Sequence, residues 1–473
     1  MKKLQELFTL KKVIRNKKFI FNRKEKGQDK CVRVIRGAFL PYLVLHTLEV
    51  GVFCLVNLMK TSFKLTRLEK YWILYDVGNS AFTLLIATIL PIYFNYISEK
   101  AGLSSVEYLA YWGYAASNTT FLIFLGGPIL GSISDNKNMK KKIFLAALLI
   151  GICGCLSLGI TIHWLVFLII FVIAKTGYSC SLIFYDSMLT DVTTPERVDM
   201  VSSQGYAWGY IGSCVPFLLC LGIVLGSDKL GISMMTAMGI SFVIISSWWG
   251  LSALPLIKHY RQTHYVENQN HIARESFLRL IGTLRDIRKE KAIFLFLISF
   301  FFYIDGVYTI IDMATVYGAA LGFDSTALLL ALLLTQIIAF PCALVFGRLA
   351  TKIRNHQLIS VCIFAYLGIS IFALFMSRQI HFWILAVLVG MFQGGIQALS
   401  RSYFAKIIPR EKSGEYFGLM DICGKGASLL GTALVSFLSQ LTGSINLGVG
   451  AIAILFILGI VFFHKAVQIL PKF

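Results

Sequence analysis

Acidic side chains inside a long apolar run are the residues of this sequence best suited to chemistry. Asp305 lies about thirteen residues into a run that covers roughly 292–318, and Asp312 follows about two helical turns later on nearly the same face. A carboxyl group in low dielectric has a raised pKa, so it can load and release protons near neutral pH. We therefore predict that this pair couples transport to protons. The competing interpretation is two hydrogen-bonded structural acids that face a wet cavity.

A second polar face opens the first strong apolar run. Asp76 lies near its start, and Asn79 and Ser80 follow within about one helical turn. The functional interpretation is a proton site or a contact to a substrate amine. The alternative is an end-of-helix carboxylate, which the helix dipole favours without any function.

Two glutamines point to the lining of a cavity. Gln393 and Gln397 are spaced i and i+4, so they share one helix face, and Gly394 and Gly395 lie between them. Together they are candidates for a cavity wall. The glycines by themselves more often indicate close helix packing.

Charged residues near the ends of the apolar runs are candidates for a gate. Arg401 and Lys425 are predicted to pair with an acid near the same end, and the candidate partners are Asp191, Asp421 and Glu415. Such pairs would close one end of a carrier. The alternative is ordinary snorkelling of long basic side chains at the membrane interface.

A further acid stands in a loop beside a basic cluster. Asp135 precedes Lys137, Lys140 and Lys141. An acid beside a helix start can latch onto a neighbouring helix and release it when two bundles rock. We predict a conformational role for this loop and no contact with substrate.

The elements that must position these residues are membrane-spanning helices. Of the 473 residues, 57% are hydrophobic and only 14% are charged, more apolar surface than soluble cores of this size can bury. A span needs roughly 20 apolar residues. The runs cover roughly 72–97, 108–132, 142–162, 164–187, 203–226, 231–257, 292–318, 325–350, 357–377, 380–404, 415–440 and 444–467. The predicted fold class is an all-α membrane protein with twelve transmembrane helices.

Much of the net charge of +20 comes from basic residues in the loops between the apolar runs, and no basic stretch has the pattern of a nucleic-acid-binding site. We therefore expect no nucleic acid as a partner. Basic residues concentrate in the loops after even-numbered runs, whereas the loops after odd-numbered runs hold only Lys100, Lys229 and Arg378. The positive-inside rule then predicts that both termini are cytoplasmic. We expect an integral protein of the cell (plasma) membrane.

The chain repeats itself, which predicts two six-helix bundles. The loop after the second run, 131–142, has its counterpart in 347–354, and Pro195-Glu-Arg has its counterpart in Pro409-Arg-Glu. Carriers built from such repeats place their substrate near the membrane midplane between the halves. The predicted domains are a basic leader over 1–68, bundles over 69–257 and 292–473, and a linker over 258–291.

Two segments outside the bundles leave alternatives open. In the linker, Phe277, Ile281, Leu284 and Ile287 recur at helical spacing with basic residues on other faces, which predicts either a helix on the inner membrane surface or a plain solvated helix. The leader contains a moderately apolar run, Ala38 to Met59. That run is an extra span, an interfacial helix or the result of a start codon placed too early.

Several segments resemble a known family. Gly131-x-x-x-Asp135 before a basic cluster is similar to the signature loop of the major facilitator superfamily. The more specific segments are 75–82, 184–191, 205–212, 303–309 and 393–402, with Phe417-Gly418 and Gly424-Lys425. Together they resemble its vacuole-effluxer branch, the autophagy-related amino-acid exporters and their bacterial relatives. The resemblance covers about 68–467. It implies the major facilitator fold and, from the yeast members, amino-acid efflux.

The sequence also departs from that pattern. The second signature loop has Thr351 near the position of the usual acid, which weakens the case for symmetric gating. Val77-Gly78 stands where Trp-Ala is more usual, a change that affects helix packing more than substrate choice.

No energy-coupling module or catalytic pattern accompanies these features. Gly418 to Gly426 mimics a phosphate-binding loop but has five intervening residues and Gly after the Lys. No zinc motif occurs, and the cysteines fall mostly in apolar runs. We expect no cofactor, no metal and no enzyme activity. The predicted function is a monomeric secondary transporter whose partners are membrane lipids, a small solute and protons. The alternative is a transporter-like sensor or a lipid-handling protein without solute flux.

Overall fold

The computed structural model describes residues 63–160, 163–267, 272–287, 289–323 and 325–469. Residues 1–62 lie outside this description. The apolar run of the leader, Ala38 to Met59, therefore lies outside the described residues.

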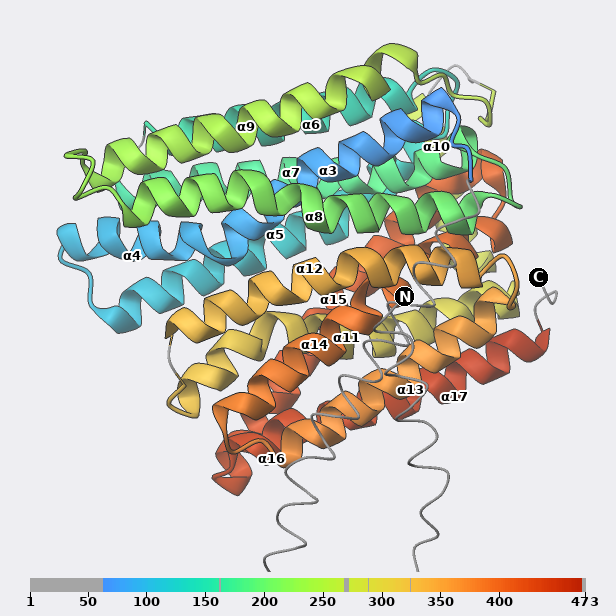
Figure 1. The fold of residues 1–473 in the computed structure, drawn as a ribbon. Helices are drawn as coiled ribbons and strands as arrows, with labels where there is room; N and C mark the ends of the chain where they lie inside the picture. The colour runs from blue at the N-terminus through green and yellow to red at the C-terminus, as the bar shows by residue number, and fades with distance from the viewer. Residues whose placement is uncertain (1–62, 161–162, 268–271, 288, 324, 470–473) are drawn as a thin grey trace, which may run out of the picture. The chain divides into compact units, whose positions relative to one another are not determined.

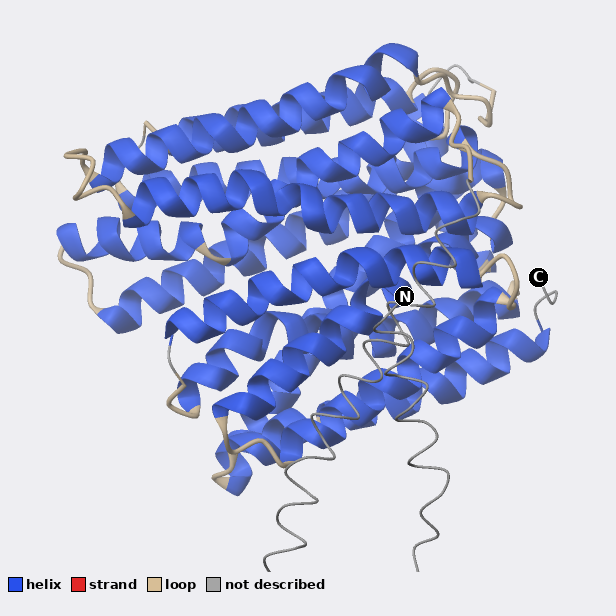
Figure 2. Cartoon of the chain, viewed as in Figure 1, coloured by secondary structure: helices blue, strands red, loops and turns tan. Residues whose placement is uncertain are grey.

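The described chain is almost wholly helical (Figures 1 and 2). The first half contains α3 (Arg67–Ala87), α4 (Ile89–Lys100), α5 (Ser105–Ser134), α6 (Lys140–Leu158), α7 (Trp164–Val192), α8 (Val198–Leu225) and α9 (Met234–His259). After α10 (Ile272–Asp286), the second half contains α11 (Lys291–Ala320), α12 (Ser325–Leu349), α13 (Asn355–Leu374), α14 (Gln379–Ile407), α15 (Ser413–Thr442), α16 (Ile445–Gly450) and α17 (Ile452–Ile469). Within the described residues, 11 helical segments are long and apolar enough to cross a membrane, and Leu430–Thr442 is a shorter apolar helix.

Local sequence signals explain where several spans begin. The hydroxyl of Thr66 accepts the backbone N–H of Glu69, and the carboxylate of Glu69 accepts the N–H of Thr66, which makes a capping box at the start of α3. Ser104 and Glu107 make the same box before α5. Each box satisfies backbone donors that the first helical turn leaves unpaired.

Several helix boundaries differ from the predicted runs, and polar residues explain two of the differences. The first span is one run in the prediction, but it divides at Thr88, whose hydroxyl donates to the carbonyl of Leu84 at 2.6 Å. The fifth span was predicted to begin at residue 203, whereas α8 begins at Val198. Polar Asp199 belongs to this helix because Asn355 and Lys406 bind its carboxylate in the interior.

The two halves pack on each other as a repeat predicts. The second span of each half lies against the fifth span of the other, so α5 contacts α15 and α12 contacts α8. Both contacts use glycine at corresponding places. A Cβ on Gly131 would lie 2.3 Å from the carbonyl oxygen of Gly414, and one on Gly347 would lie 2.6 Å from Cβ of Ser203. The predicted fold of two related six-helix bundles is confirmed.

The loops rich in basic residues gather at one end of the helices. This end, called the basic end below, comprises α10 and the loops 135–139, 193–197, 260–267, 350–354 and 408–412, toward the right in Figure 1. Two of these loops touch directly, because Asn136 and Val266 form a parallel β-bridge.

A gate and a charge cluster between the bundles

Arg401 joins the two bundles through a buried ion cluster. Its guanidinium Nη1 lies 2.9 Å from Oδ1 of Asp186 in α7, and Nη2 lies 3.6 Å from Oδ2 of Asp76 in α3. Nε and Nη2 also donate to the hydroxyl and the carbonyl of Ser202, at 2.9 and 3.0 Å. Arg401 is 3% exposed, so its charge depends on these partners for stabilisation.

Aromatic rings enclose the same guanidinium. Its central carbon lies 4.2 Å from the ring centre of Tyr206, 4.7 Å from Trp72 and 5.6 Å from Tyr185. Cation–π attraction is stronger in a site that excludes water. The rings all belong to the first bundle, so they add to the attraction between the halves.

The predicted partners of Arg401 were wrong in part. Its ion pairs go to Asp76 and Asp186, while Asp191 and Glu415 pair elsewhere, with Lys140 and Arg279. Sequence spacing gives the depth of a residue in its own helix but not the neighbour across the interface. The side chain of Lys425, the other predicted gate base, lies outside the described residues.

Asp76 lies well inside α3 and not at its end. Asn79 donates to its Oδ1 at 3.3 Å, while its Oδ2 accepts no hydrogen bond within the described residues. Gly205 of α8 permits this approach, because a Cβ there would lie 2.8 Å from Oδ2 of Asp76 and 3.1 Å from Nη2 of Arg401. Dipole stabilisation at a helix end therefore does not explain Asp76.

Hydrogen bonds to Asp135 join the first bundle to the second, and its conformational role stays a prediction. Its carboxylate accepts the backbone N–H groups of Gly414 and Glu415, at 2.7 and 2.9 Å, in the first turn of α15. These donors are unpaired within the helix, and the helix dipole favours a negative charge there. Burial nevertheless raises the pKa of Asp135 to about 7, against the lowering effect of Lys140 and of the two N–H groups.

Lys140 and Asp191 form the second part of this closure. Lys140 Nζ lies 3.3 Å from Asp191 Oδ2 and donates at 2.8 Å to the hydroxyl of Ser413 in the second bundle. Asp191 also accepts the hydroxyl of Tyr260 at 2.5 Å and the N–H of His264 at 2.9 Å. The loop after α9 is thus held to the end of α7.

The second half closes differently, as Thr351 suggested. Thr351 is exposed, and its hydroxyl donates to the carbonyl of Arg348 at 2.7 Å. The cross-bundle bonds come instead from Asn355, which donates to Asp199 at 2.6 Å, and from Lys406, which binds the same carboxylate. In both of these contacts between the bundles, the acidic residue, Asp135 or Asp199, therefore belongs to the first bundle.

Asp305 and Asp312, predicted as a proton-coupling pair, differ in exposure, and their role in proton coupling stays a prediction. Asp305 is fully buried inside the second bundle, where its Oδ1 accepts the N–H of Gly431 at 3.0 Å and the hydroxyl of Thr309 at 3.2 Å. Its Oδ2 has no hydrogen-bond partner within the described residues. Asp312 is exposed, yet protein surrounds it on most sides and it interacts electrostatically with Lys175 of α7.

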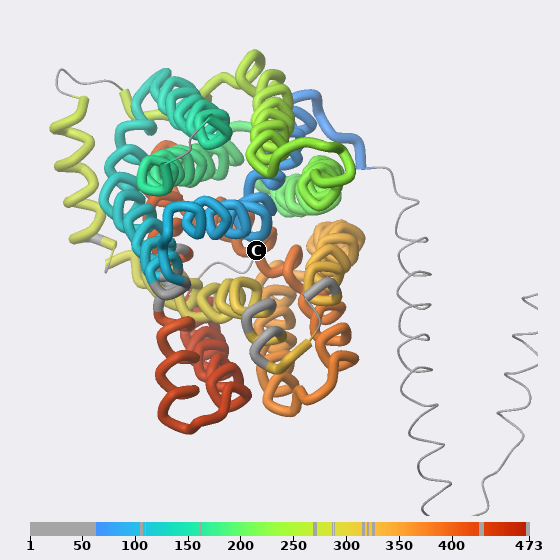
Figure 3. Tube along the Cα trace, turned by 90° about the vertical axis from the view of Figure 1, so that its left-hand side faces the viewer, coloured from blue at the N-terminus to red at the C-terminus, as the bar shows by residue number. Residues whose placement is uncertain are grey.

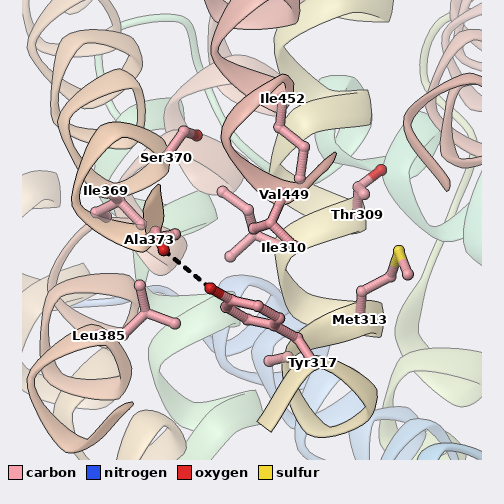
Figure 4. Close-up of a pocket in the computed structure, with 11 residues that line it drawn as sticks. Thr309, Ile310, Met313, Tyr317, Ile369, Ser370, Ala373, Leu385, Val449 and Ile452 are labelled. Atoms are coloured by element: carbon pink, nitrogen blue, oxygen red, sulfur yellow. Dashed lines mark hydrogen bonds between the residues drawn. The ribbon is translucent and has the colours of Figure 1, made fainter. Parts of the chain in front are cut away.

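A narrow cavity lies beside Thr309 in the second bundle (Figure 4). It has a volume of about 20 Å³ and is lined mainly by apolar side chains, among them Ile310, Met313 and Leu385. The hydroxyl of Tyr317 donates to the carbonyl of Ala373 at 2.9 Å at its edge. A space of this size holds about one water and no solute.

The glutamine pair lies at the bundle interface. Gln397 accepts the hydroxyl of Tyr210 of α8 at 2.9 Å, and Gln393 is buried one turn away. Gly394 allows close packing there, because a Cβ would lie 3.1 Å from the ring of Tyr210. Contact with a solute stays a prediction for both glutamines.

Sequence reasoning missed two charged residues that the structure makes prominent. Lys175 is a single lysine within the apolar run 164–187, and Asp186 lies near the end of the same run. Placing an ionisable residue inside a span costs free energy, so such a residue is a functional candidate. This rule could have identified both residues from the sequence. Lys141, grouped with Lys140 in the prediction, is half-buried in the first turn of α6.

Comparisons with known proteins agree on one kind of protein. The sequence model of the vacuole effluxer Atg22-like family matches residues 190–468. YxiO of Bacillus subtilis (strain 168), described as an uncharacterized MFS-type transporter, is 40% identical over 403 residues, which cover 84% of this chain and 94% of that protein. Autophagy-related protein 22 of Saccharomyces cerevisiae (strain ATCC 204508 / S288c) is 25% identical over 292 residues, 53% of this chain and 54% of that protein.

Solved structures share the fold. The proton:xylose symporter XylE matches with a TM-score of 0.66 at 10% identity, over 86% of this chain and 95% of that chain. The transporter FucP in its outward conformation matches with a TM-score of 0.64 at 16% identity, over 85% and 97%. Both belong to the major facilitator superfamily.

Proposed function

Because this chain belongs to the vacuole effluxer Atg22-like family, and is thereby a major facilitator transporter in a membrane, we propose that it exports amino acids or similar small solutes in exchange for protons. The observation that carries this proposal is the buried cluster of Arg401, Asp76 and Asp186 between the bundles. This cluster places positive and negative charges at the interface between the bundles, which must open and close during alternating access.

The basic end is the closed side of the carrier in this proposal. Asp135, Lys140, Arg401 and Asp199 each bind a group of the opposite bundle there. The deepest of the hydrogen bonds between the bundles described above joins Tyr210 to Gln397. Polar contacts of this kind can break and reform as rigid bundles rock. Their position supports a state that is closed at the basic end.

The basic end faces the cytoplasm in this proposal. The concentration of Lys and Arg in its loops supports that orientation under the positive-inside rule. The closed state is then outward-facing, and the solute leaves toward the opposite side. The membrane is the cell membrane of the source organism.

Opposed charges support a zwitterionic solute. Lys175 on α7 and Asp312 on α11 interact across the two bundles, and Tyr308 interacts electrostatically with Asp312 and Asp186. An amino acid carries an ammonium group and a carboxylate, which such a pair can bind at the same time. Amino-acid efflux by the yeast relatives supports amino acids as the solute in this proposal.

Asp305 is the proposed proton site. Its burial and its unpartnered Oδ2 make the ionised form costly, so a proton is expected to occupy it in one state of the cycle. Asp312 and Asp76, nearer the bundle interface, belong to the proposed pathway of the solute.

The test is uptake of a mixed pool of labelled amino acids into proteoliposomes, with and without an imposed pH gradient. Gradient-dependent accumulation supports the proposal. The control variant Asp228→Asn, which changes an exposed acid in a loop, should accumulate amino acids as the unchanged protein does. Absence of accumulation by folded, inserted protein would reject amino acids as the solute. Binding without flux would favour a sensor over a transporter.

A further inference from the structure

The linker helix α10 binds the first bundle through one face. Its buried residues are Ser276, Leu280 and Thr283, spaced three or four apart, and Ile287, which directly follows the helix, is buried too; the helix packs against α5. Figure 3 views the spanning helices nearly end-on, and α10 lies at their margin and runs across the view. Because the spans cross the membrane, we expect a helix in this position to lie along the membrane surface.

The same helix contacts the residues around Asp135 and Glu415 that join the two bundles at the basic end. The hydroxyl of Ser132 donates to the carbonyl of Ser276 at 2.9 Å, and Asn136 donates to the hydroxyl of Ser276 at 2.9 Å. One turn later, Arg279 Nε lies 3.3 Å from Oε2 of Glu415 in α15. Ser132 and Asn136 flank Asp135, and Glu415 supplies one of its two N–H donors. The helix therefore touches both sides of the latch that joins the bundles.

An apolar face of α10 points away from the protein. Phe277, Ile281 and Leu284 follow at i, i+4 and i+7, and each is nearly half exposed, with Phe277 and Ile281 at 46% and Leu284 at 48%. At about 100° per residue, Arg274 and Arg285 fall beside this stripe, on the side away from the buried face. Both arginines are exposed. Apolar residues bordered by arginines are the pattern of a helix that lies in a bilayer interface.

We propose that α10 reads the lipid surface: its apolar stripe enters the interface, Arg274 and Arg285 bind acidic phospholipid headgroups, and the bound helix holds Arg279 on Glu415. Charge complementarity selects an anionic bilayer as the occupant of this face. Acidic lipid then stabilises the state that is closed at the basic end. The inference rests on the gate of the proposed function and adds its regulation by lipid.

The first test measures the depth of the stripe in the full-length protein in nanodiscs. A nitroxide on Ile281→Cys, in a background without other accessible cysteines, should collide more with oxygen than with a water-soluble nickel chelate. Asn138→Cys, on an exposed loop of the same end, should show the opposite preference. A label at 281 as aqueous as the one at 138 would overturn the proposal and indicate a solvated or protein-binding face.

The second test compares phosphatidylcholine nanodiscs with discs that contain about 30 mol % phosphatidylglycerol. Hydrogen exchange in residues 272–287 and 413–418 should slow in the acidic discs, by about fivefold for each arginine that reaches the headgroups. Arg274→Ala/Arg285→Ala should remove the effect, and Arg261→Ala/Lys352→Ala, which removes two exposed bases elsewhere at this end, should keep it. Equal exchange in both lipids would overturn the proposal. Neither test measures flux, so their failure leaves the transport proposal standing.

Discussion

Nη1 of Arg401 lies 2.9 Å from Oδ1 of Asp186, so a base of the second bundle forms an ion pair with an acid of the first. Opening the basic end must separate these two groups and expose Arg401 to water or to another acid. Breaking a buried pair costs far more than breaking a surface pair, because one charge is left unsolvated. The pair is therefore expected to set much of the stability of the closed state.

Removing both members should destabilise the closed state by less than the sum of the two single losses. We expect Arg401→Gln to lower the stability of the closed state by about 3 kcal/mol, because it leaves the buried Asp76 without its cation. Asp186→Asn should lower it by less, because Arg401 keeps Asp76 as a partner. The double variant should recover about 1 kcal/mol of the summed loss. Thermal unfolding in detergent measures all three, and Lys137→Gln, which breaks the exposed pair with Glu267, should change little. If the stability losses of the two single variants simply add in the double variant, Arg401 and Asp186 do not interact directly.

Lowering the pH should favour the closed state through Asp135. The pKa of its buried carboxyl is about 7 in the closed state and returns toward about 3.9 when water reaches it, so the closed state binds the proton more tightly. Closure should therefore strengthen as pH falls through 7 and weaken as pH rises, by at most about tenfold per pH unit. Spin-label distances between Asn138 and Thr351, exposed on opposite bundles, report this equilibrium. Asp135→Asn should lose the dependence, and its persistence would assign the titration to another group.

A methyl group at Gly131 should hold the bundles apart. A Cβ there would lie 2.3 Å from the carbonyl oxygen of Gly414, and backbone cannot yield as a flexible side chain can. Gly131→Ala should cost the closed state about 1–3 kcal/mol and slow transport. Gly113→Ala is the matched control in the same helix, because nothing lies within 4 Å of its Cβ. Equal behaviour of the two variants in the spin-label distances would show that α5 and α15 do not meet as described.

The two acids of α11 should have different effects. Asp305 is buried with one unpartnered oxygen, so we expect Asp305→Asn to abolish the response of flux to a pH gradient while solute still binds. Asp312 is exposed and interacts with Lys175, so Asp312→Asn should weaken solute binding by about tenfold and keep the response. Counterflow and gradient-driven uptake separate the two effects. Intact pH-driven flux in both variants would end the assignment of proton coupling to α11.

Periodicity and loop charge were sufficient to predict the helices and the repeat. The predicted run 357–377 and helix α13 at Asn355–Leu374 differ by only a few residues, because a bilayer forces every backbone group of a span into helical hydrogen bonds. The loop acid Asp135 was predicted as a latch, and the structure gives it two backbone donors across the interface. That role depends on local chemistry, an acid beside a helix start, which a sequence displays directly.

The sequence by itself determined the class of protein, the number of spans and the shortlist of buried charges, since each follows from the cost of placing residues in hydrocarbon. Only the tertiary structure decided the partners. It paired Arg401 with Asp186 and Asp76, and it buried Asp305 while leaving Asp312, on nearly the same helix face, exposed. Helical spacing fixes the direction of a side chain from its own axis, whereas its neighbour depends on how helices distant in sequence cross. The crossing is set by packing over whole interfaces, such as Gly131 against Gly414, which no local pattern contains.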